Sequence, residues 1–478
     1  MHLLFSNVLL CALQQRWARC SPVTGSTCAW NMPGDTRTVV VHITHHTGDQ
    51  AWVAKVQGET SNAAMYFCSY ADATKTTYKQ NGAIGVGDPD EDQDYQQLTG
   101  LPVVFREWRM EERVAAGKKV KSANDDPKQK PINPKDIGSR QLTPPPITLA
   151  AIVDPLHAQI NAWTHWLGEF IDELVATCGR AGYETLNNKA FDTLPPSHPL
   201  VVTYVALQEC SMTRTAASLR KSWDMKMKKE RTRLIGKETR TLCRRFGVLT
   251  QRLTECIATT LATRASKVVV GKLMFRVALF HHWALLLRHV SCLSCMPTLC
   301  ADQLANMIQA STALGNMRLC LHTAVPEQWL FRQCDFTLCR VVPRHAYLLH
   351  IQYNGCGLGR YSMQGREHAN CAAKAQLKKT TAQDKWQPLI FYSAVNGQFL
   401  AREPGSGFPA GDRSPSQKSS YVPNSTMIDM GTNIDCQHEG CSLWADKSKT
   451  AMIWQLCSAD PNTIDDSTKN KNKRLMNV

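Results

Sequence analysis

A chain of 478 residues, 43% of them hydrophobic, is long enough to bury two or three apolar cores. This length excludes a small scaffold that needs disulfides or a metal ion in order to fold. The 19 cysteines therefore leave two interpretations open: pairing in an oxidising compartment, or buried thiols and metal ligands in a reducing one.

The N-terminal segment 1–20 resembles a signal peptide. Its apolar run, from Leu3 to Leu13, is too short to span a bilayer and is followed by the small residues Ala18 and Cys20. No Lys or Arg precedes the run, however, and a first buried helix or strand has the same pattern. We adopt the signal peptide, and with it a secreted or cell-surface location in which most cysteines pair.

Residues 21–116 are predicted to contain β structure. Between Arg37 and Tyr70, the β-favouring runs "TVVVHITHH", "AWVAKVQG" and "AAMYFCSY" alternate with turns, which predicts three antiparallel strands. The following segment, 117–147, is rich in Lys, Asp and Pro and has little to bury. Its composition is typical of a linker or mobile loop.

Residues 148–401 are predicted to form a helical core domain. An amphipathic helix is expected from Asp154 to Cys178, because Asp154 can cap it, a proline follows, and apolar side chains recur at intervals of four and three. The same spacing predicts helices over Thr241–Leu261 and Leu273–Leu287. We expect the first two helices to pair antiparallel along their apolar stripes, with the third beside them.

The pattern changes after Pro343, where "HAYLLHIQYNGCGLGRYS" predicts a short β hairpin within the core domain. Residues 402–433 have the composition of a disordered linker, and 434–478 contain a small cysteine module and a basic tail. The predicted fold class is mainly α: an elongated helical bundle with an N-terminal antiparallel β segment and, after the linker, a small Cys-containing C-terminal module.

No transmembrane segment is predicted. The most apolar stretch, Val277–Leu287, has only eleven residues and contains two histidines. It lies between Arg276 and Arg288, which is typical of a buried core or interface helix.

The stretch "RHVSCLSCMPTLC", Arg288–Cys300, has the Cys-x-x-Cys spacing of a zinc or redox site. Pro297 ends the preceding helix, however, so its cysteines fall in the last helical turn, where the helix dipole disfavours a thiolate. Cys320 and His322 begin a second ligand pair, but the next ligand does not follow at the required distance. We therefore expect paired or buried cysteines and no metal site. The candidate disulfide cysteines are Cys292, Cys295, Cys300, Cys436, Cys441 and Cys457.

The remaining motifs predict no catalytic or cofactor-binding site. The acidic run Asp88–Asp94 lacks the glycine and glutamate of a calcium loop, and Gly355–Gly359 misplaces the third glycine of a dinucleotide fingerprint. The serine–lysine spacing of Ser218–Lys221 lies in a charged helical stretch and arises often by chance. The chain is therefore predicted to be a non-enzymatic structural or interaction protein without a cofactor.

Positive charge is concentrated in one segment. Between Met212 and Arg276 lie 17 Lys or Arg and four acidic residues, so this segment carries +13 of the net charge of +15. A solvated helix face is the commoner meaning of such a segment, but it can also neutralise nucleic-acid phosphates. An intracellular nucleic-acid-binding protein is thus the alternative function. Its candidate contacts are Lys226, Lys228, Lys229, Arg231, Arg233, Arg244 and Arg245.

The C-terminal stretch "CQHEGCSLWADKSKTAMIWQLC" contains Cys436, Cys441, Trp444 and Cys457, and a glycosylation sequon at Asn424 precedes it. With the signal-like start and long helices, this order resembles a trypanosome variant surface glycoprotein. The chain departs from that family in lacking a hydrophobic anchor tail and in having few alanines and many cysteines in its helices. The resemblance implies a non-enzymatic, dimeric coat protein glycosylated at Asn424.

Overall fold

The computed structural model describes part of the chain: residues 26–31, 38–43, 45–56, 67–71, 73, 75, 78–79, 150–180, 190–224, 233–261, 263, 266–324 and 329–363. Helices make up 77% of this part, so the prediction of a mainly α protein is confirmed. The chain divides into two compact units, one of residues 1–70 with 108–152 and one of residues 71–107 with 153–478.

Among its described residues, the first unit contains short strands and the helix α2. Strands β1 (Ser26–Asn31) and β2 (Thr38–Ile43) pair antiparallel, with Ser26 opposite Ile43. Strand β3 (His45–Gly48) pairs with β4 (Ala150–Val153) in a parallel two-stranded sheet.

The strand predicted for "AWVAKVQG" is wrong, because Gln50–Val56 forms helix α2. The side chain of Asp49 accepts the backbone N–H of Trp52 at 2.7 Å, which satisfies a free donor at the first turn and favours a helix over a strand. Residues 57–66, which include the start of the third predicted strand, lie outside the described residues. The predicted antiparallel arrangement of three strands between Arg37 and Tyr70 therefore stays a prediction.

The second unit contains long helices at each place where the apolar spacing predicts them. They are α5 (Pro155–Arg180), α8 (Gly236–Cys256) and α9 (Lys267–Ser294). The carboxylate of Asp154 accepts the backbone N–H groups of Leu156 and His157 at 3.1 and 3.3 Å, so the predicted cap of the first helix is confirmed. The other helices of this unit are α6 (Pro199–Glu209), α7 (Thr213–Asp224), α10 (Ala301–Ala324), α11 (Gln333–Phe336) and α12 (Val342–Gln352). The described part of this unit also contains the 3-10 turns η3 (Phe191–Thr193) and η6 (Leu358–Tyr361) and the π-helical turns η4 (Ile257–Leu261) and η5 (Thr337–Val341).

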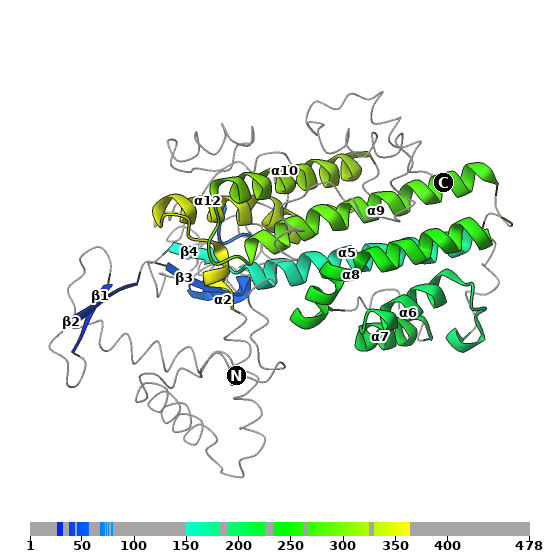
Figure 1. Cartoon of the computed structure of the whole chain (residues 1–478), viewed down its shortest axis with the longest axis horizontal. Coiled ribbons are helices and arrows are strands. Elements are labelled where there is room, and N and C mark those ends of the chain that lie inside the picture. The colour runs from blue at the N-terminus through cyan, green and yellow to red at the C-terminus, as the bar shows by residue number, and fades with distance from the viewer. Residues whose placement is uncertain are drawn as a thin grey trace, which may run out of the picture. The chain divides into compact units, whose positions relative to one another are not determined.

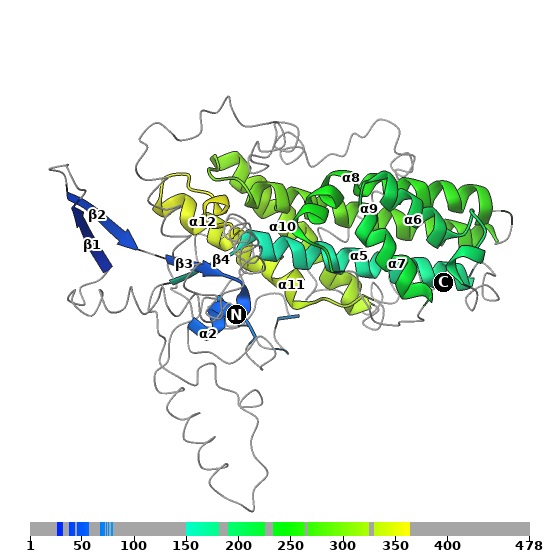
Figure 2. The ribbon, with the colours of Figure 1, turned by 90° about the horizontal axis from the view of Figure 1, so that it is seen from below.

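Helix α9 packs against α5, α8 and α10, and these helices lie side by side in Figure 1 and Figure 2. Helices α5 and α9 run antiparallel. Near the start of α5, Gln159 Nε2 donates to Ser294 Oγ at 3.0 Å at the end of α9. Further along α5, Trp166 Nε1 donates to the carbonyl of Phe280 at 3.0 Å, nearer the start of α9.

Helix α8 also runs antiparallel to α9, since the Arg288 guanidinium lies 5.4 Å from the Phe246 ring and Thr250 Oγ1 lies 2.8 Å from His281 Nδ1. It follows that α5 and α8 run parallel to each other, so the predicted antiparallel pairing of these two helices is wrong. The connections explain the difference. Only residues 257–266 join α8 to α9, which favours a hairpin, whereas residues 181–235 separate α5 from α8 and let the chain return.

Helix α9 is long and apolar enough to span a membrane, and no other helix among the described residues meets that criterion. In its most apolar window, 67% is buried inside the structure. A buried core helix has the same composition, so the criterion does not separate the two possibilities.

The β hairpin predicted after Pro343 is wrong. The run "HAYLLHIQ" belongs to helix α12, in which Val342, Ala346 and Leu349 are buried at helical spacing. The glycine-rich turn that follows is real: Asn354 and Gly355 have φ of 46° and 83°, in the left-handed region, and they lie just after the end of the helix.

Candidate functional site

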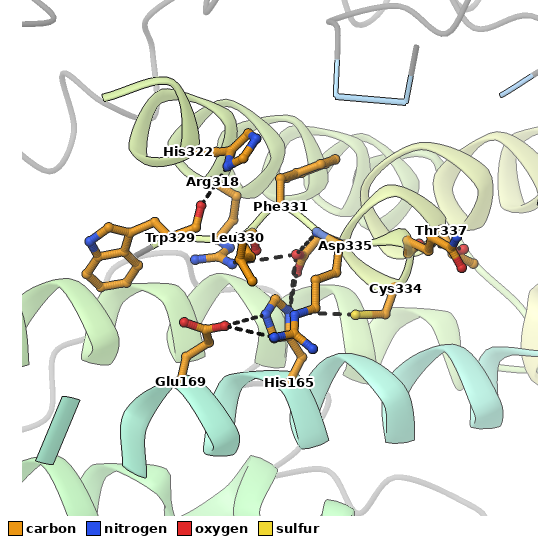
Figure 3. Close-up of polar contacts among 12 residues, drawn as sticks. His165, Glu169, Arg318, His322, Trp329, Leu330, Phe331, Cys334, Asp335 and Thr337 are labelled. Atoms are coloured by element: carbon orange, nitrogen blue, oxygen red, sulfur yellow. Dashed lines mark hydrogen bonds and ion pairs between the residues drawn. The ribbon is translucent and has the colours of Figure 1, made fainter. Parts of the chain in front are cut away.

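A buried cluster of ionisable side chains joins α5 to α11 (Figure 3). Helix α5 contributes His165 and Glu169, one helical turn apart, and α11 contributes the adjacent residues Cys334 and Asp335. Helix α10 contributes Arg318, which has no exposed surface. The carboxylate of Asp335 lies between the Arg318 guanidinium and the His165 ring.

His165 is the centre of this cluster, because both of its ring nitrogens are engaged. Its Nε2 lies 3.0 Å from Glu169 Oε1. Its Nδ1 lies 3.2 Å from Asp335 Oδ2, 3.3 Å from Asp335 Oδ1 and 3.6 Å from Cys334 Sγ. His165, Glu169 and Asp335 are buried, and Cys334 is half-buried.

The local sequence explains these positions. His165 and Glu169 are four residues apart, so they share one face of α5. Asp335 lies in the first turn of α11, where its Oδ2 accepts the backbone N–H of Arg332 at 2.8 Å and caps the helix. The π-helical turn η5 follows directly, and such turns occur frequently at functional sites.

Arg318 supports the cluster from the other side. Its Nη2 donates to the carbonyl of Leu330 at 2.7 Å and lies 3.6 Å from Asp335 Oδ2. Its guanidinium stacks on the Trp283 ring at 3.7 Å from the centroid. A buried arginine is thus held by a carbonyl, a carboxylate and an aromatic face, which together compensate the cost of removing its charge from water.

The cluster changes the protonation of its members. Burial raises the pKa of Asp335, but the nearby His165 and Arg318 charges lower it by more than burial raises it. The resulting pKa of Asp335 is about 2. Burial lowers the pKa of His165, but Asp335 and Cys334 raise it, and the resulting pKa lies well above its usual value. Both shifts favour the ion-paired form of His165 and Asp335.

Three kinds of chemistry use these residue types: a buried ion-pair network, a cysteine nucleophile with a histidine base, and a metal site. The nucleophile is the weakest of the three. Asp335 lies closer than Cys334 to the same His165 nitrogen, so the imidazolium charge is neutralised by the carboxylate and not reserved for a thiolate. For a metal, one donor atom each from His165, Cys334 and Asp335 lies within 4.8 Å of the others.

The predicted cysteine motif does not form a site of this kind. Helix α9 ends at Ser294, so the prediction that Cys292 and Cys295 lie at the end of a helix is confirmed. Cys292 is buried and hydrogen bonds Cys243, and Cys300 is exposed. All three predicted cysteines are free thiols, so the structure gives their predicted pairing no support. The other candidates, Cys436, Cys441, Cys457 and the sequon at Asn424, lie outside the described residues.

The basic segment is only partly described, since Lys226, Lys228, Lys229 and Arg231 lie outside the described residues. Arg233, Arg244 and Arg245 are exposed, as expected for residues outside the apolar stripe of α8. One of these arginines also makes a contact within the protein: Arg245 Nη1 donates to the carbonyl of Glu209 at 2.9 Å. These arginines do not come together with the His165 cluster.

Sequence reasoning missed the His165 cluster. The spacing of His165 and Glu169 was a usable signal, because it places a base and a carboxylate on one helix face. Asp335 and Cys334 lie about 170 positions further along the chain, and no local pattern marks them as partners. Comparisons of the whole chain with protein-family models, curated proteins and solved structures found no match.

Proposed function

We propose that the protein is a non-enzymatic structural or interaction protein whose architectural unit is a helical bundle. The observation that carries this proposal is the ion-pair network of His165, Asp335 and Arg318. It links three helices, α5, α11 and α10, because the Asp335 carboxylate faces both the His165 ring and the Arg318 guanidinium. Such a network fixes how helices pack, which is a use of buried charge in structural cores.

The buried cysteines support a structural role, because they pack in the core of the protein. Eleven cysteines in the described part of the chain are free thiols, and eight of these are buried. Buried free cysteine behaves as a small apolar residue, so these thiols add to the core without pairing. The coat-glycoprotein form of the proposal, with its surface location, homodimer and glycan on Asn424, is supported by sequence features alone.

The stability of Asp335→Asn tests the structural role. If the network is structural, this change leaves two buried cations without their carboxylate and lowers the free energy of unfolding by about 3 kcal/mol or more. Catalytic clusters commonly show the opposite, since replacing a strained active-site residue often stabilises the fold. Urea unfolding of the variant, beside the exposed Asp302→Asn on α10 as control, decides between them. A gain of stability in Asp335→Asn contradicts the proposal.

Expression of the full chain in a eukaryotic cell tests the coat-glycoprotein form. That form predicts a mature N-terminus near residue 21 and a glycosidase-sensitive mass that is lost in Asn424→Gln. A chain that retains Met1 and shows no glycan contradicts it.

Nucleic-acid binding is the second candidate, and the exposure of Arg233, Arg244 and Arg245 favours it. Affinity for a labelled duplex should then fall steeply with salt, and Arg244→Ala should lower the slope of log affinity against log salt by about 1. Arg252→Ala is the matched control, because Arg252 is exposed on the same helix and is not one of the candidate contacts. Equal slopes for both variants and the unmodified chain count against this function.

A further inference from the structure

The donor atoms around His165 Nδ1 have the spacing of a tetrahedral zinc site. With Zn–N of about 2.0–2.1 Å, Zn–S of about 2.3 Å and tetrahedral angles, a ligand nitrogen lies about 3.6 Å from a ligand sulfur and about 3.4 Å from a ligand oxygen. His165 Nδ1 lies 3.6 Å from Cys334 Sγ and 3.3 Å from Asp335 Oδ1. Two edges of the tetrahedron are therefore already in place.

We propose that His165, Cys334 and Asp335 bind a zinc ion between α5 and α11. This inference does not depend on the function proposed above. A nitrogen, a thiolate sulfur and a carboxylate oxygen form a ligand set that suits this borderline-soft ion. The third edge, between Cys334 Sγ and the Asp335 carboxylate, spans no more than 4.8 Å.

The other nitrogen of His165 supports the assignment. A metal-bound histidine usually donates its second ring N–H to a carboxylate, which fixes the tautomer and the ring orientation. In the structure, Glu169 Oε1 lies 3.0 Å from His165 Nε2, on the side of the ring opposite to Cys334 and Asp335 (Figure 3). Glu169 is in turn approached by Arg332 Nη2 at 3.5 Å, which holds the carboxylate in place.

Both oxygens of Asp335 lie near His165 Nδ1, Oδ2 at 3.2 Å and Oδ1 at 3.3 Å. Oδ2 also accepts the backbone N–H of Arg332 at 2.8 Å and lies 3.6 Å from Arg318 Nη2. Oδ1 can therefore bind the ion while Oδ2 keeps its hydrogen bond to Arg332, which is the arrangement that orients metal-ligating carboxylates.

The ligand forms of these side chains are neutral imidazole, thiolate and carboxylate, so binding of the ion is accompanied by release of protons.

Cobalt(II) substitution of the purified full-length chain tests the site. After treatment with a chelator and a reductant, Co²⁺ is titrated and its absorption recorded, because tetrahedral coordination gives intense visible bands and a thiolate ligand gives a near-ultraviolet charge-transfer band. Zn²⁺ should then displace Co²⁺ with a stoichiometry of one ion per chain. We expect Cys334→Ser to lose the charge-transfer band and to bind Zn²⁺ at least about 100-fold more weakly.

Matched variants separate this site from adventitious binding by the other thiols. Cys300→Ser removes an exposed thiol at the start of α10 and should leave the spectrum unchanged. Glu169→Gln keeps all three ligands and should weaken Zn²⁺ binding by about 10- to 100-fold. Circular dichroism checks that each variant is folded. The proposal is overturned if the unmodified chain shows no tetrahedral Co²⁺ spectrum, or if Cys334→Ser shows the same spectrum as Cys300→Ser.

Discussion

The central carbon of the Arg318 guanidinium lies 3.7 Å from the centroid of the Trp283 ring. Both side chains are buried, so this cation–π contact is shielded from water and stronger than an exposed one. Because Trp283 belongs to α9 and Arg318 to α10, the contact joins the central helix to the helix that carries the charge next to Asp335.

Arg318→Lys should therefore destabilise the fold although it keeps the charge. Lysine cannot stack as a planar group on Trp283 while also donating to the Leu330 carbonyl and facing Asp335. We expect the free energy of unfolding to fall by about 2 kcal/mol or more in urea titrations. The matched control is Arg252→Lys, exposed on α8, for which a change within about 0.5 kcal/mol is expected. Equal effects of both changes contradict this role for Arg318.

Two positions on α5 test the burial of its apolar stripe. Leu167 is 1% exposed, whereas Val175 on the same helix is 39% exposed. Leu167→Ala leaves a cavity and should cost about 3 kcal/mol of unfolding free energy, and Val175→Ala should change it by about 0.5 kcal/mol or less. Chemical denaturation of the two variants measures both values. Similar losses at the two sites show that this face of α5 is not the core.

Glu173 and Arg276 form a second buried ion pair, between α5 and α9. The Arg276 side chain is 1% exposed and that of Glu173 is 13% exposed. Glu173→Gln should cost about 3 kcal/mol, because the buried arginine loses its counter-charge. In Arg276→Met that charge is absent, so the same change at Glu173 should cost much less. A double-mutant cycle measures the difference, and purely additive effects rule out the coupling.

The sequence predicts α5, α8 and α9 for a physical reason, whereas the long helix α10 was not predicted. In α5, α8 and α9 the apolar spacing follows the 3.6-residue period, and Asp154 marks the start of α5 with a capping side chain. The direction in which α5 and α8 pack is not contained in that spacing, because an apolar stripe can be buried against a partner of either direction. The length of the connection decides it, and α6 and α7 fill that connection.

Short apolar runs are where sequence reasoning fails. "AWVAKV" and "HAYLLHIQ" both read as strands, and both are helices, α2 and α12. Over so few residues, a strand and a buried helical face have similar apolar patterns. The His165 cluster was missed for another reason. His165 and Asp335 are brought together by packing across 170 positions, which no spacing along the chain encodes.

The last prediction concerns pH and His198, which caps α6. Its Nδ1 accepts the backbone N–H of Leu200 at 3.3 Å, which requires the neutral ring. Burial lowers the pKa of His198 from 6.5 to about 4. The unfolded chain therefore takes up this proton near pH 6.5 and the folded chain only near pH 4. The stability that depends on the neutral ring is complete above pH 6.5 and is lost as the pH falls through that window.

His198→Asn isolates this effect, because asparagine is a favourable cap and does not titrate. At pH 7.5 the variant should be the less stable, because asparagine does not fill the space of the buried ring beside Trp223. Between pH 7.5 and pH 5 the unmodified chain should lose roughly 1 to 2 kcal/mol more than the variant, since only the unmodified chain binds a proton on unfolding at this position. Urea unfolding at both pH values gives the comparison, and the difference between the two chains cancels every other group that titrates in the same range. If the free energies of unfolding of the two chains fall equally between pH 7.5 and pH 5, then the cap of α6 does not require the neutral form of His198. The acid sensitivity of the fold must then arise from other groups.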